Sequence, residues 1–285
     1  MKTVNSISGG KTSAYIAANY SADRNVFALV RTSDKNCLFP DSKIRQIVSD
    51  KIGQEFIGTL EDDAIIYTIL DLEQFIGSEI DWVTGVTFDE VISGKYGSVL
   101  PNKLRRYCTS EMKMKPMFEW WRQNFNEPIE MRIGFRANEM NRAKSTIEKL
   151  NSNGLLTYKA IVGQSKNGRN KWSEIEWEKP SFPLIKDSIF KDTIEEYWKN
   201  KSVRFAKLNN CVGCFHRDPI VLKYISEREP NKFEWFCNAE HNRKYKYDTW
   251  KESGNLTYDK IKNHKLQFQL FEDDFNECDS GYCGI

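Results

Sequence analysis

The 285-residue sequence contains no run of 18 uncharged apolar residues, so it offers no candidate for a membrane-spanning helix. Its first ten residues lack the charged start, apolar run and cleavage site of a signal peptide. An excess of one charge is also missing, because 42 Lys and Arg face 40 Asp and Glu and the formal net charge is +2. We therefore expect a cytoplasmic protein without a membrane partner, in which any binding to nucleic acid depends on local patches.

Glycine and proline are scarce, at 16 and 8 residues, and 40% of the residues are hydrophobic. This composition is typical of a folded globular protein and excludes collagen-like or disordered classes. The seven cysteines are odd in number, and the chain is long enough to fold without disulfides. Their clustering therefore favours metal or thiol chemistry in a reducing compartment.

Strand-like and helix-like segments alternate through the first half of the chain. Residues 3–7 alternate weakly between polar and apolar, as in a strand, and residues 26–30 form an unbroken apolar run typical of a buried strand. Pro40 and Asp41 open an amphipathic helix that Gly53 ends. Further alternation follows around residues 56–57, 64–75, 82–83, 108–125 and 129–133. The pattern predicts an α/β fold with a doubly wound parallel sheet.

The composition of the sequence changes after about residue 141. A polar, Gly-containing stretch at residues 164–171 precedes an amphipathic helix near residues 194–198. From Cys211 onward the chain is rich in aromatic residues and cysteines. We predict a nucleotide-binding domain over residues 1–150 and a smaller cysteine-rich appendage over residues 151–285.

A glycine loop follows the first predicted strand and precedes a predicted helix. Two glycines let the backbone approach phosphate oxygens, and the helix start adds free N–H groups and the positive end of its dipole. The loop lacks the spacing of a Walker loop and of a dinucleotide fingerprint, and a plain Gly-Gly turn is the alternative. The predicted nucleotide-binding residues are Ser8, Gly9, Gly10, Lys11, Thr12 and Ser13.

This loop resembles the S-G-G-K-D-S signature of the PP-loop ATP pyrophosphatases, and in particular their phosphoadenosine-phosphosulfate reductase-like group, with Thr12 in place of the usual Asp. Other family motifs recur in the same order between residues 3 and 220. They are Leu38–Asp41 (F-P-E-T), Arg106–Thr109 with Lys113 and Pro116 (R-x-C-T and L-K-x-x-P), Gly134–Arg142 (G-x-R-x-x-E-S-x-x-R), Phe182–Leu184 and Cys211–Cys214 (P-L and C-x-x-C). The resemblance implies a Rossmann-like, adenine nucleotide alpha hydrolase-like sheet that binds ATP with Mg²⁺.

Charged residues near the expected strand ends are the candidates for catalysis beside Lys11. Arg136 and Arg142 can grip phosphate or sulfate through paired N–H donors, and Glu139 can hold an arginine or a bound hydroxyl. Lys113 is a candidate to neutralise charge that develops at the α-phosphate. The alternative for all four is a solvated, charged helix surface.

The cysteines suggest a metal or an iron–sulfur cluster. Cys211 and Cys214 have C-x-x-C spacing, Cys278 and Cys283 form a second close pair, and four sulfurs suffice for zinc or iron. The family resemblance adds Cys108 as a ligand of a [4Fe-4S] cluster. Cys37 and Cys237 are predicted to be buried structural thiols, and His216 is a weaker candidate ligand.

The C-terminal cysteines have a second interpretation. Sulfonucleotide reductases carry a nucleophilic cysteine in an E-C-G-x-H context, and Glu277-Cys278 and Cys283-Gly284 each match half of it. The segments 166–171 and 241–250 interleave basic and aromatic residues and are candidate nucleic-acid contacts. Resemblance to thiolating relatives implies DNA or tRNA and a sulfur donor protein as partners, and we also expect a homo-oligomer.

Three functions are compatible with these features. The first is an ATP-dependent adenylating transferase that moves sulfur to a nucleic acid or a small acceptor. The second is a phosphoadenylylsulfate or adenylylsulfate reductase, which Lys11 disfavours because the reductases generally lack that lysine. The third is a nucleotide-binding, metal-stabilised interaction module without turnover, for which Thr12 is the best support.

Overall fold

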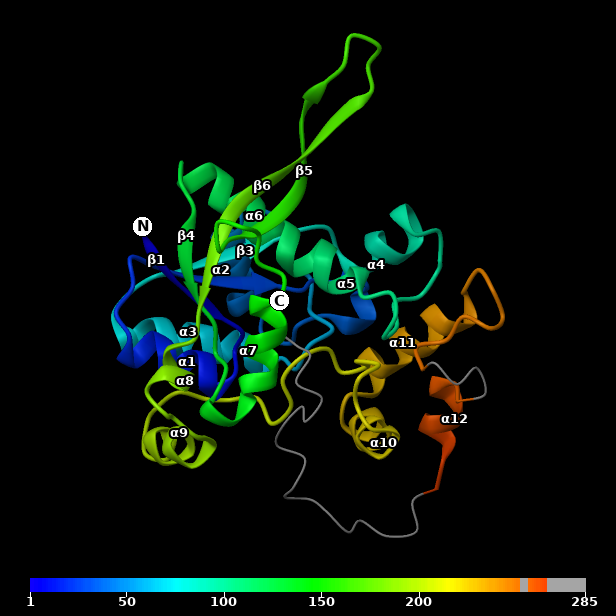
Figure 1. The fold of residues 1–285 in the computed structure, drawn as a ribbon. Coiled ribbons are helices and arrows are strands. Elements are labelled where there is room, and N and C mark those ends of the chain that lie inside the picture. The colour runs from blue at the N-terminus through cyan, green and yellow to red at the C-terminus, as the bar shows by residue number, and fades with distance from the viewer. Residues whose placement is uncertain (252–255, 266–285) are drawn as a thin grey trace. The chain divides into compact units, whose positions relative to one another are not determined.

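The computed structural model describes residues 1–251 and 256–265 and has an α/β fold (Figure 1). Its six-stranded sheet has the order β3-β2-β1-β4-β6-β5, in which β1, β2, β4 and β6 pair in parallel and β5 pairs antiparallel to β6. The strands are β1 (Thr3–Ile7), β2 (Arg24–Leu29), β3 (Ile80–Thr84), β4 (Ile129–Arg132), β5 (Leu156–Gln164) and β6 (Asn170–Ser181). The predicted α/β class with a mostly parallel sheet is confirmed.

Helices connect and flank these strands. The α-helices are α1 (Lys11–Asn19), α2 (Ser42–Ile52), α3 (Ala64–Ile76), α4 (Phe88–Glu90), α5 (Tyr107–Thr109), α6 (Lys115–Asn124), α7 (Met140–Ile147), α8 (Pro183–Lys186), α9 (Lys191–Trp198), α10 (Pro219–Arg228), α11 (Pro230–His241) and α12 (Tyr258–Asn263). Short 3₁₀ or π turns are η1 (Lys35–Cys37), η2 (Val91–Lys95), η3 (Ser110–Met114) and η4 (Ala137–Glu139). Within residues 1–251 and 256–265, every helix is too short or too polar to cross a bilayer.

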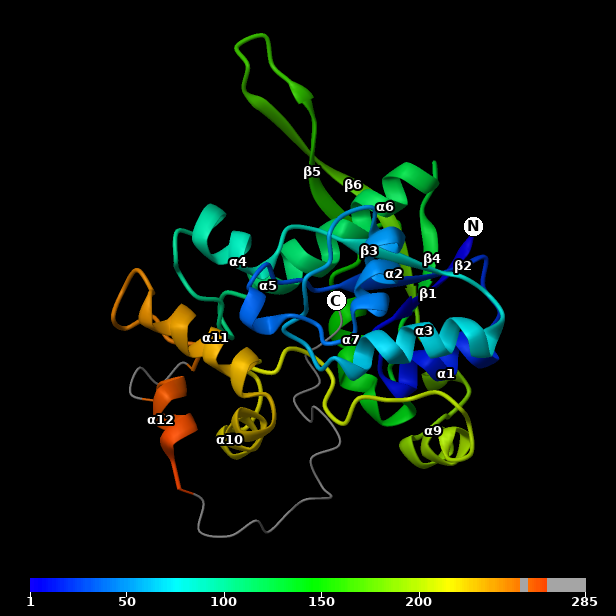
Figure 2. The ribbon, with the colours of Figure 1, turned by 180° about the vertical axis from the view of Figure 1, so that it is seen from behind.

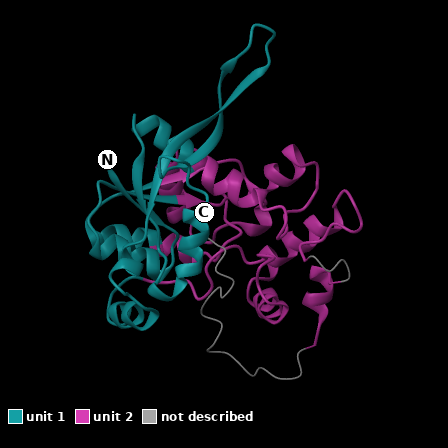
Figure 3. Cartoon of the chain, in the orientation of Figure 1, with its two compact units in different colours: residues 1–27, 69–81, 117–203 teal, residues 28–68, 82–116, 204–285 magenta. Residues whose placement is uncertain are grey.

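The chain divides into two compact units that are interleaved along the sequence (Figure 3). Unit 1 comprises residues 1–27, 69–81 and 117–203, and unit 2 comprises residues 28–68, 82–116 and 204–285. The predicted division into a nucleotide-binding domain over residues 1–150 and an appendage over residues 151–285 stays a prediction.

Unit 1 is held together by packing on β1 and on the β5–β6 pair. Val4 and Ile16 are fully buried between β1 and α1. On β6, the Trp177 ring packs edge-on against Phe118 of α6, which also stacks on Tyr158 of β5 at 4.4 Å between ring centroids. These aromatic contacts fix the base of the hairpin to helix α6.

Unit 2 has an aromatic core of its own. Phe236 and Trp250 are almost fully buried and pack edge to face with 5.1 Å between ring centroids. Cys37 and Cys237 lie in this core, 2% and 0% exposed, as predicted for structural thiols. Burial raises the pKa of each thiol to about 12, so both stay protonated near neutral pH.

Local sequence signals explain where several helices begin and end. The Asp41 carboxylate accepts hydrogen bonds from the N–H groups of Lys43 and Ile44, which caps α2 as the sequence predicts. Gly53 ends the same helix in the left-handed conformation, with φ of 66°. Pro219 stands at the first turn of α10 behind the capping Asp218.

The β5–β6 hairpin is the largest difference from the sequence-based expectation. The polar stretch around residues 164–171 is the tip of a long two-stranded hairpin, and residues 172–177 belong to β6. Residues 129–132 of β4 pair in parallel with residues 178–181 of β6. The chain beyond residue 150 therefore supplies two strands of the central sheet.

A buried carboxyl lies at the base of β6. Glu178 is 1% exposed, and its Oε1 finds no hydrogen-bond partner within the described parts of the chain. Burial raises the pKa of Glu178 to about 8, because the charged form loses its hydration. The folded chain therefore keeps this proton at pH values where an unfolded chain has released it.

Glu178 is expected to make the fold less stable as the pH rises. Between its ordinary pKa of about 4.3 and its folded pKa, the unfolded state binds fewer protons, and the free energy of unfolding falls by up to about 1.4 kcal/mol per pH unit. The stabilisation that the protonated Glu178 side chain contributes is complete below its ordinary pKa. It is lost once the pH has risen above its folded pKa. Urea unfolding of Glu178→Gln from pH 5 to 9 should show a flatter profile than the wild type. Glu174→Gln, an exposed change on the same strand, should keep the wild-type slope; parallel profiles for all three proteins would refute the assignment.

Candidate functional site

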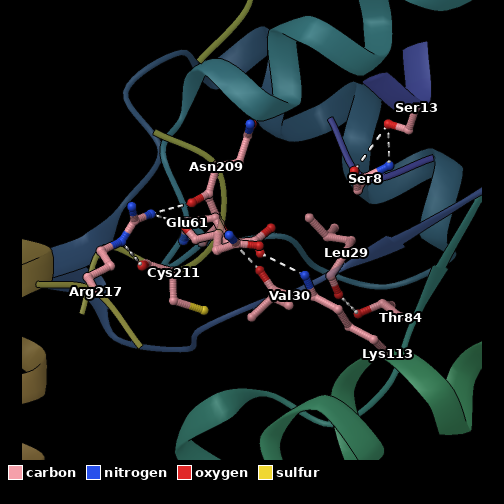
Figure 4. Close-up of polar contacts among 12 residues, drawn as sticks. Ser8, Ser13, Leu29, Val30, Glu61, Thr84, Lys113, Asn209, Cys211 and Arg217 are labelled. Carbon is pink, nitrogen blue, oxygen red and sulfur yellow. Dashed lines mark hydrogen bonds and ion pairs between the residues drawn. The ribbon is translucent and has the colours of Figure 1, made fainter. Parts of the chain in front are cut away.

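The first candidate site is the glycine loop between β1 and α1 in unit 1, which we call the loop site. Gly9 has a φ of 79°, and Gly10 precedes α1 with an extended backbone and no side-chain hydrogen bond that caps the helix. The Ser13 hydroxyl accepts from the N–H of Ser8 at 3.0 Å (Figure 4) and donates to the carbonyl of Gly10 at 3.0 Å. Ser13 thus fixes the loop from within, and no side chain in the described parts of the chain caps the first turn of α1.

The segment after β4 passes close to this loop. A Cβ on Gly134 would lie 3.3 Å from the backbone nitrogen of Ser13 and 3.4 Å from the Cγ2 of Thr12. Strands β1 and β4 are parallel neighbours, so the segments that follow them leave the same edge of the sheet. Glycine at position 134 permits this close approach of the two backbones.

Arg136, Glu139 and Arg142 form one connected group beyond Gly134. The Glu139 carboxylate accepts from the backbone N–H of Arg136 at 2.8 Å, from its Nε at 3.1 Å, and from the guanidinium of Arg142. The Arg142 guanidinium also lies over the ring of Phe135, at 4.2 Å from its centroid. The sequence-predicted trio is therefore brought together, with Glu139 holding both arginines.

The charge state of Glu139 follows from these contacts. Burial alone would raise the pKa of Glu139, but the hydrogen bonds from Arg136 and Arg142 and their positive charges lower it below its usual value. The carboxylate is thus charged at neutral pH. It forms ion pairs with both arginines and so holds their guanidinium groups beside each other.

Lys11 has a partner that no motif in the sequence predicts. Its ammonium group forms an ion pair with Glu195 of α9, and both side chains are more than one third exposed. The indole N–H of Trp198, also on α9, donates to the backbone carbonyl of Lys11 at 3.0 Å. Helix α9 therefore holds the first turn of α1, and an anion at the loop must compete with Glu195 for Lys11.

The second candidate site lies in unit 2 around the C-x-x-C segment, and we call it the thiol site. Cys211 pairs with Glu61 in an isolated antiparallel bridge, and the N–H of Cys214 donates to the carbonyl of Cys211 at 3.0 Å to close a tight turn. Arg217 donates to the carbonyl of Cys211 at 3.3 Å and to that of Asn209 (Figure 4). The turn that presents the two cysteines is thus fixed by backbone contacts.

Cys108, Cys211 and Cys214 are close enough to influence one another. Burial, and to a smaller extent the neighbouring Cys214, raise the pKa of Cys108 to about 11. Burial also raises the pKa of Cys211 well above its usual value, and Glu61, Cys214 and Cys108 add to that effect. These three of the five sequence-predicted ligands are brought together in unit 2. Cys278 and Cys283 lie outside the described residues.

The thiol site is not a ready-made single-ion site. Across residues 1–251 and 256–265, no three His, Cys, Asp or Glu side chains are arranged to hold a metal ion. Burial and the charges of Arg106, Lys103 and Lys251 lower the pKa of His216 to about 4, so its ring is neutral at pH 7. A neutral imidazole is the form that binds metals, and His216 keeps its place as a weaker candidate.

Lys113 belongs to unit 2 and is tied to a buried carboxylate. Its Nζ lies 3.0 Å from Oε1 of Glu61, whose side chain is 4% exposed (Figure 4). Lys232 donates to the backbone carbonyl of Glu61 at 2.8 Å and to the Asp63 carboxylate at 2.7 Å. The role predicted for Lys113 at the α-phosphate stays a prediction. Glu61 and Lys232 carry no recognisable sequence motif, which is why the sequence did not single them out.

The two basic and aromatic segments differ in exposure. Trp250 is 1% exposed and belongs to the core of unit 2, and the Arg243 guanidinium donates to the backbone carbonyls of Glu240 and Lys246. Tyr245 and Tyr247 are exposed and stack on each other at 5.4 Å between centroids. Residues 166–171, by contrast, are exposed throughout at the tip of the β5–β6 hairpin.

Comparisons with known proteins do not assign a function, so any assignment depends on the geometry of the two candidate sites. The chain gives no significant match to a protein-family model, to a curated protein or to a solved structure. What the fold and the two sites define is an α/β protein with an uncapped glycine loop at a sheet edge in one unit and grouped thiols in the other.

Proposed function

We propose that the chain is a PP-loop type, ATP-dependent adenylating enzyme of the cytoplasm, with the adenine nucleotide alpha hydrolase-like version of the Rossmann-like sheet. The observation that carries this proposal is the glycine loop, whose helix start has no side-chain cap and begins with the basic Lys11. The backbone N–H groups after Gly10 and the Lys11 ammonium would hold the β- and γ-phosphates of ATP. Bound Mg²⁺ would neutralise part of the phosphate charge, and the hydroxyls of Ser8 and Thr12 are the nearby oxygen donors.

The proposed reaction activates an acceptor and then exchanges oxygen for sulfur. An acceptor oxygen attacks the α-phosphorus, the bond to the bridging oxygen breaks, and pyrophosphate leaves with that electron pair. Arg136 and Arg142 would stabilise charge on the phosphates, and their contacts with Glu139, which holds both guanidinium groups, support this role. A sulfur donor protein then supplies a nucleophilic sulfur that displaces AMP from the acceptor, which is a nucleic acid or a small molecule.

The grouped thiols of unit 2 support a role for a cysteine-rich part in this chemistry. Cys108, Cys211 and Cys214 would hold a [4Fe-4S] cluster, with Cys278 or Cys283 as the fourth ligand, or a zinc ion as the alternative. The bound cluster would supply a site for sulfur or electron chemistry. The chain's own contribution is the rigid turn at Cys211–Cys214, which the bridge to Glu61 anchors.

Changes at Lys11 and Glu195 test the nucleotide site in opposite directions. Lys11→Ala removes a charge-assisted contact and should weaken ATP binding roughly 10- to 100-fold. Glu195→Gln removes the competing carboxylate of an exposed ion pair and should tighten binding by up to about fivefold. Calorimetry with ATP and the release of pyrophosphate on addition of an acceptor measure the two steps. Glu196→Gln, on the same helix, is the matched control and should bind ATP like the wild type.

Each alternative function gives a different result in the same assays. Sulfite release from phosphoadenylylsulfate with thioredoxin, without ATP consumption, would indicate a reductase. Tight ATP binding without pyrophosphate release, whichever acceptor is added, would indicate an interaction module. Thr12, which stands in place of the usual Asp, would then explain the missing turnover. Absence of ATP binding in the wild type would contradict the proposal.

A further inference from the structure

The β5–β6 hairpin carries an exposed surface that the nucleotide chemistry does not use. Residues 161–164 of β5 and 170–174 of β6 are exposed on both faces of the ribbon, which extends away from the rest of unit 1 (Figures 1 and 2). The tip is ordered by its own contacts, since the N–H of Ser165 donates to the carbonyl of Arg169 and Gly168 adopts a φ of 72°. The hairpin is thus a shaped, projecting arm.

The outer part of this arm, from residue 157 to residue 173, carries charge of one sign only. Its basic residues are Lys159, Lys166, Arg169 and Lys171, and no acidic residue occurs from residue 157 to residue 173. The whole chain has a net charge of only +2, so this segment is strongly basic against a nearly neutral background. The nearest acidic side chain, Glu174, is paired across the ribbon with Lys159 at the base of the arm. Such a distribution fits a polyanion at the tip.

Apolar side chains are exposed beside these charges. Trp172 is 57% exposed and lies opposite Ile161 in the antiparallel register, so the two side chains share one face of the ribbon. Val162 is 49% exposed at the irregularity next to them. The pair of Trp172 and Ile161 stabilises the ribbon only modestly, by about 0.2–1 kcal/mol. Exposed apolar groups beside basic ones are typical of surfaces that contact bases as well as phosphates.

We infer that the β5–β6 hairpin is a DNA-binding arm that enters a groove of duplex DNA. A two-stranded ribbon has the width that the major groove of B-form DNA admits, whereas the deep, narrow major groove of duplex RNA excludes it. Lys166, Arg169 and Lys171 contact phosphates, and the Trp172 and Ile161 face lies against base edges. This inference does not depend on ATP binding, and it adds an interaction surface to the proposed function.

Binding of the full-length chain to a 20-base-pair duplex, followed by fluorescence anisotropy without ATP, tests the arm. The triple variant Lys166→Ala, Arg169→Ala, Lys171→Ala should bind at least about tenfold more weakly and flatten the dependence of log K on log salt by about 2.7, or 0.9 per lost contact. The control Lys149→Ala, Lys186→Ala, Lys199→Ala removes the same charge from exposed positions outside the hairpin and should keep the wild-type affinity and salt slope.

A change at Trp172 separates base contact from charge. Trp172→Ala should weaken binding while the salt slope stays unchanged, and Trp172→Phe should restore most of the affinity. Circular dichroism and ATP calorimetry on each variant show whether the fold and the loop site are intact, so failure of the arm and failure of the nucleotide site are distinguishable. No duplex binding by the wild type, equal loss in both triple variants, or tighter binding to single-stranded DNA or duplex RNA would overturn the inference.

Discussion

Replacing Gly58 with alanine is expected to abolish stable folding of unit 2. A Cβ at this position would lie 1.9 Å from the carbonyl oxygen of Cys37 and 3.0 Å from its carbonyl carbon. Both atoms belong to the backbone, so no side-chain rotation relieves the clash. The segment around Gly58 also accepts two backbone hydrogen bonds from the segment that contains Cys37. Thr32 N–H donates to the Gly58 carbonyl, and Phe39 N–H donates to the Ile57 carbonyl. Separating the two segments to admit one methyl group would therefore break these hydrogen bonds as well.

The expected loss is large relative to the stability of a typical domain. Effects above about 4 kcal/mol are exceptional for single substitutions and arise from such backbone clashes, while whole domains are stable by about 5–15 kcal/mol. Guanidinium unfolding followed by circular dichroism measures the change. Gly94→Ala is the control, because a Cβ there has no atom within 4 Å and alanine favours a helical turn. Equal stability of the two variants would contradict the close contact between Gly58 and the Cys37 carbonyl.

The second large effect is expected at Cys211. If the grouped thiols bind a [4Fe-4S] cluster, serine at this position removes a ligand, and protein purified without oxygen should lose its brown colour, its absorbance near 400 nm and its iron. Cys211 is the cysteine whose backbone is bridged to Glu61 and held by Arg217, so its loss is not compensated by a shift of the turn. Serine is close in size to cysteine, and the fold should survive.

Two further variants make the cysteine result specific. Cys237→Ala removes a fully buried thiol of the unit 2 core and should cost some stability while leaving the iron content unchanged. Cys278→Ser and Cys283→Ser, measured side by side, identify which C-terminal cysteine completes the set. A colourless wild-type protein that contains one zinc per chain would overturn the cluster and support the zinc alternative, and full iron in Cys211→Ser would remove this cysteine from the ligands.

The sequence predicted the elements whose signals are local. The Asp41 cap, the Gly53 stop and the glycine loop between a strand and a helix are each set by a few adjacent residues, and all three occur where expected. The grouping of Arg136, Glu139 and Arg142 is equally local, because they are three residues apart along one turn and helix. Such features depend little on the rest of the fold.

The features that the sequence left out depend on distant parts of the chain. In β6, Ile175 and Trp177 alternate with Glu174 and Glu176, which is a short period-two pattern. Residues 170–174 before them are exposed on both faces and lack the apolar alternation that usually marks a strand. Glu195 meets Lys11 across more than 180 residues, and Glu61 meets Lys113 across more than 50. No spacing in the sequence reports such pairs, because the packing of helices and loops sets them.

The measurement that bears most directly on the central claim is a crystal structure of the chain with a non-hydrolysable ATP analogue. The account predicts that the β- and γ-phosphates lie on the backbone N–H groups at the start of α1, that Lys11 has moved from Glu195 to a phosphate oxygen, and that Gly134 remains in contact with the loop. A nucleotide bound elsewhere, or an empty loop at a saturating concentration of the analogue, would contradict it.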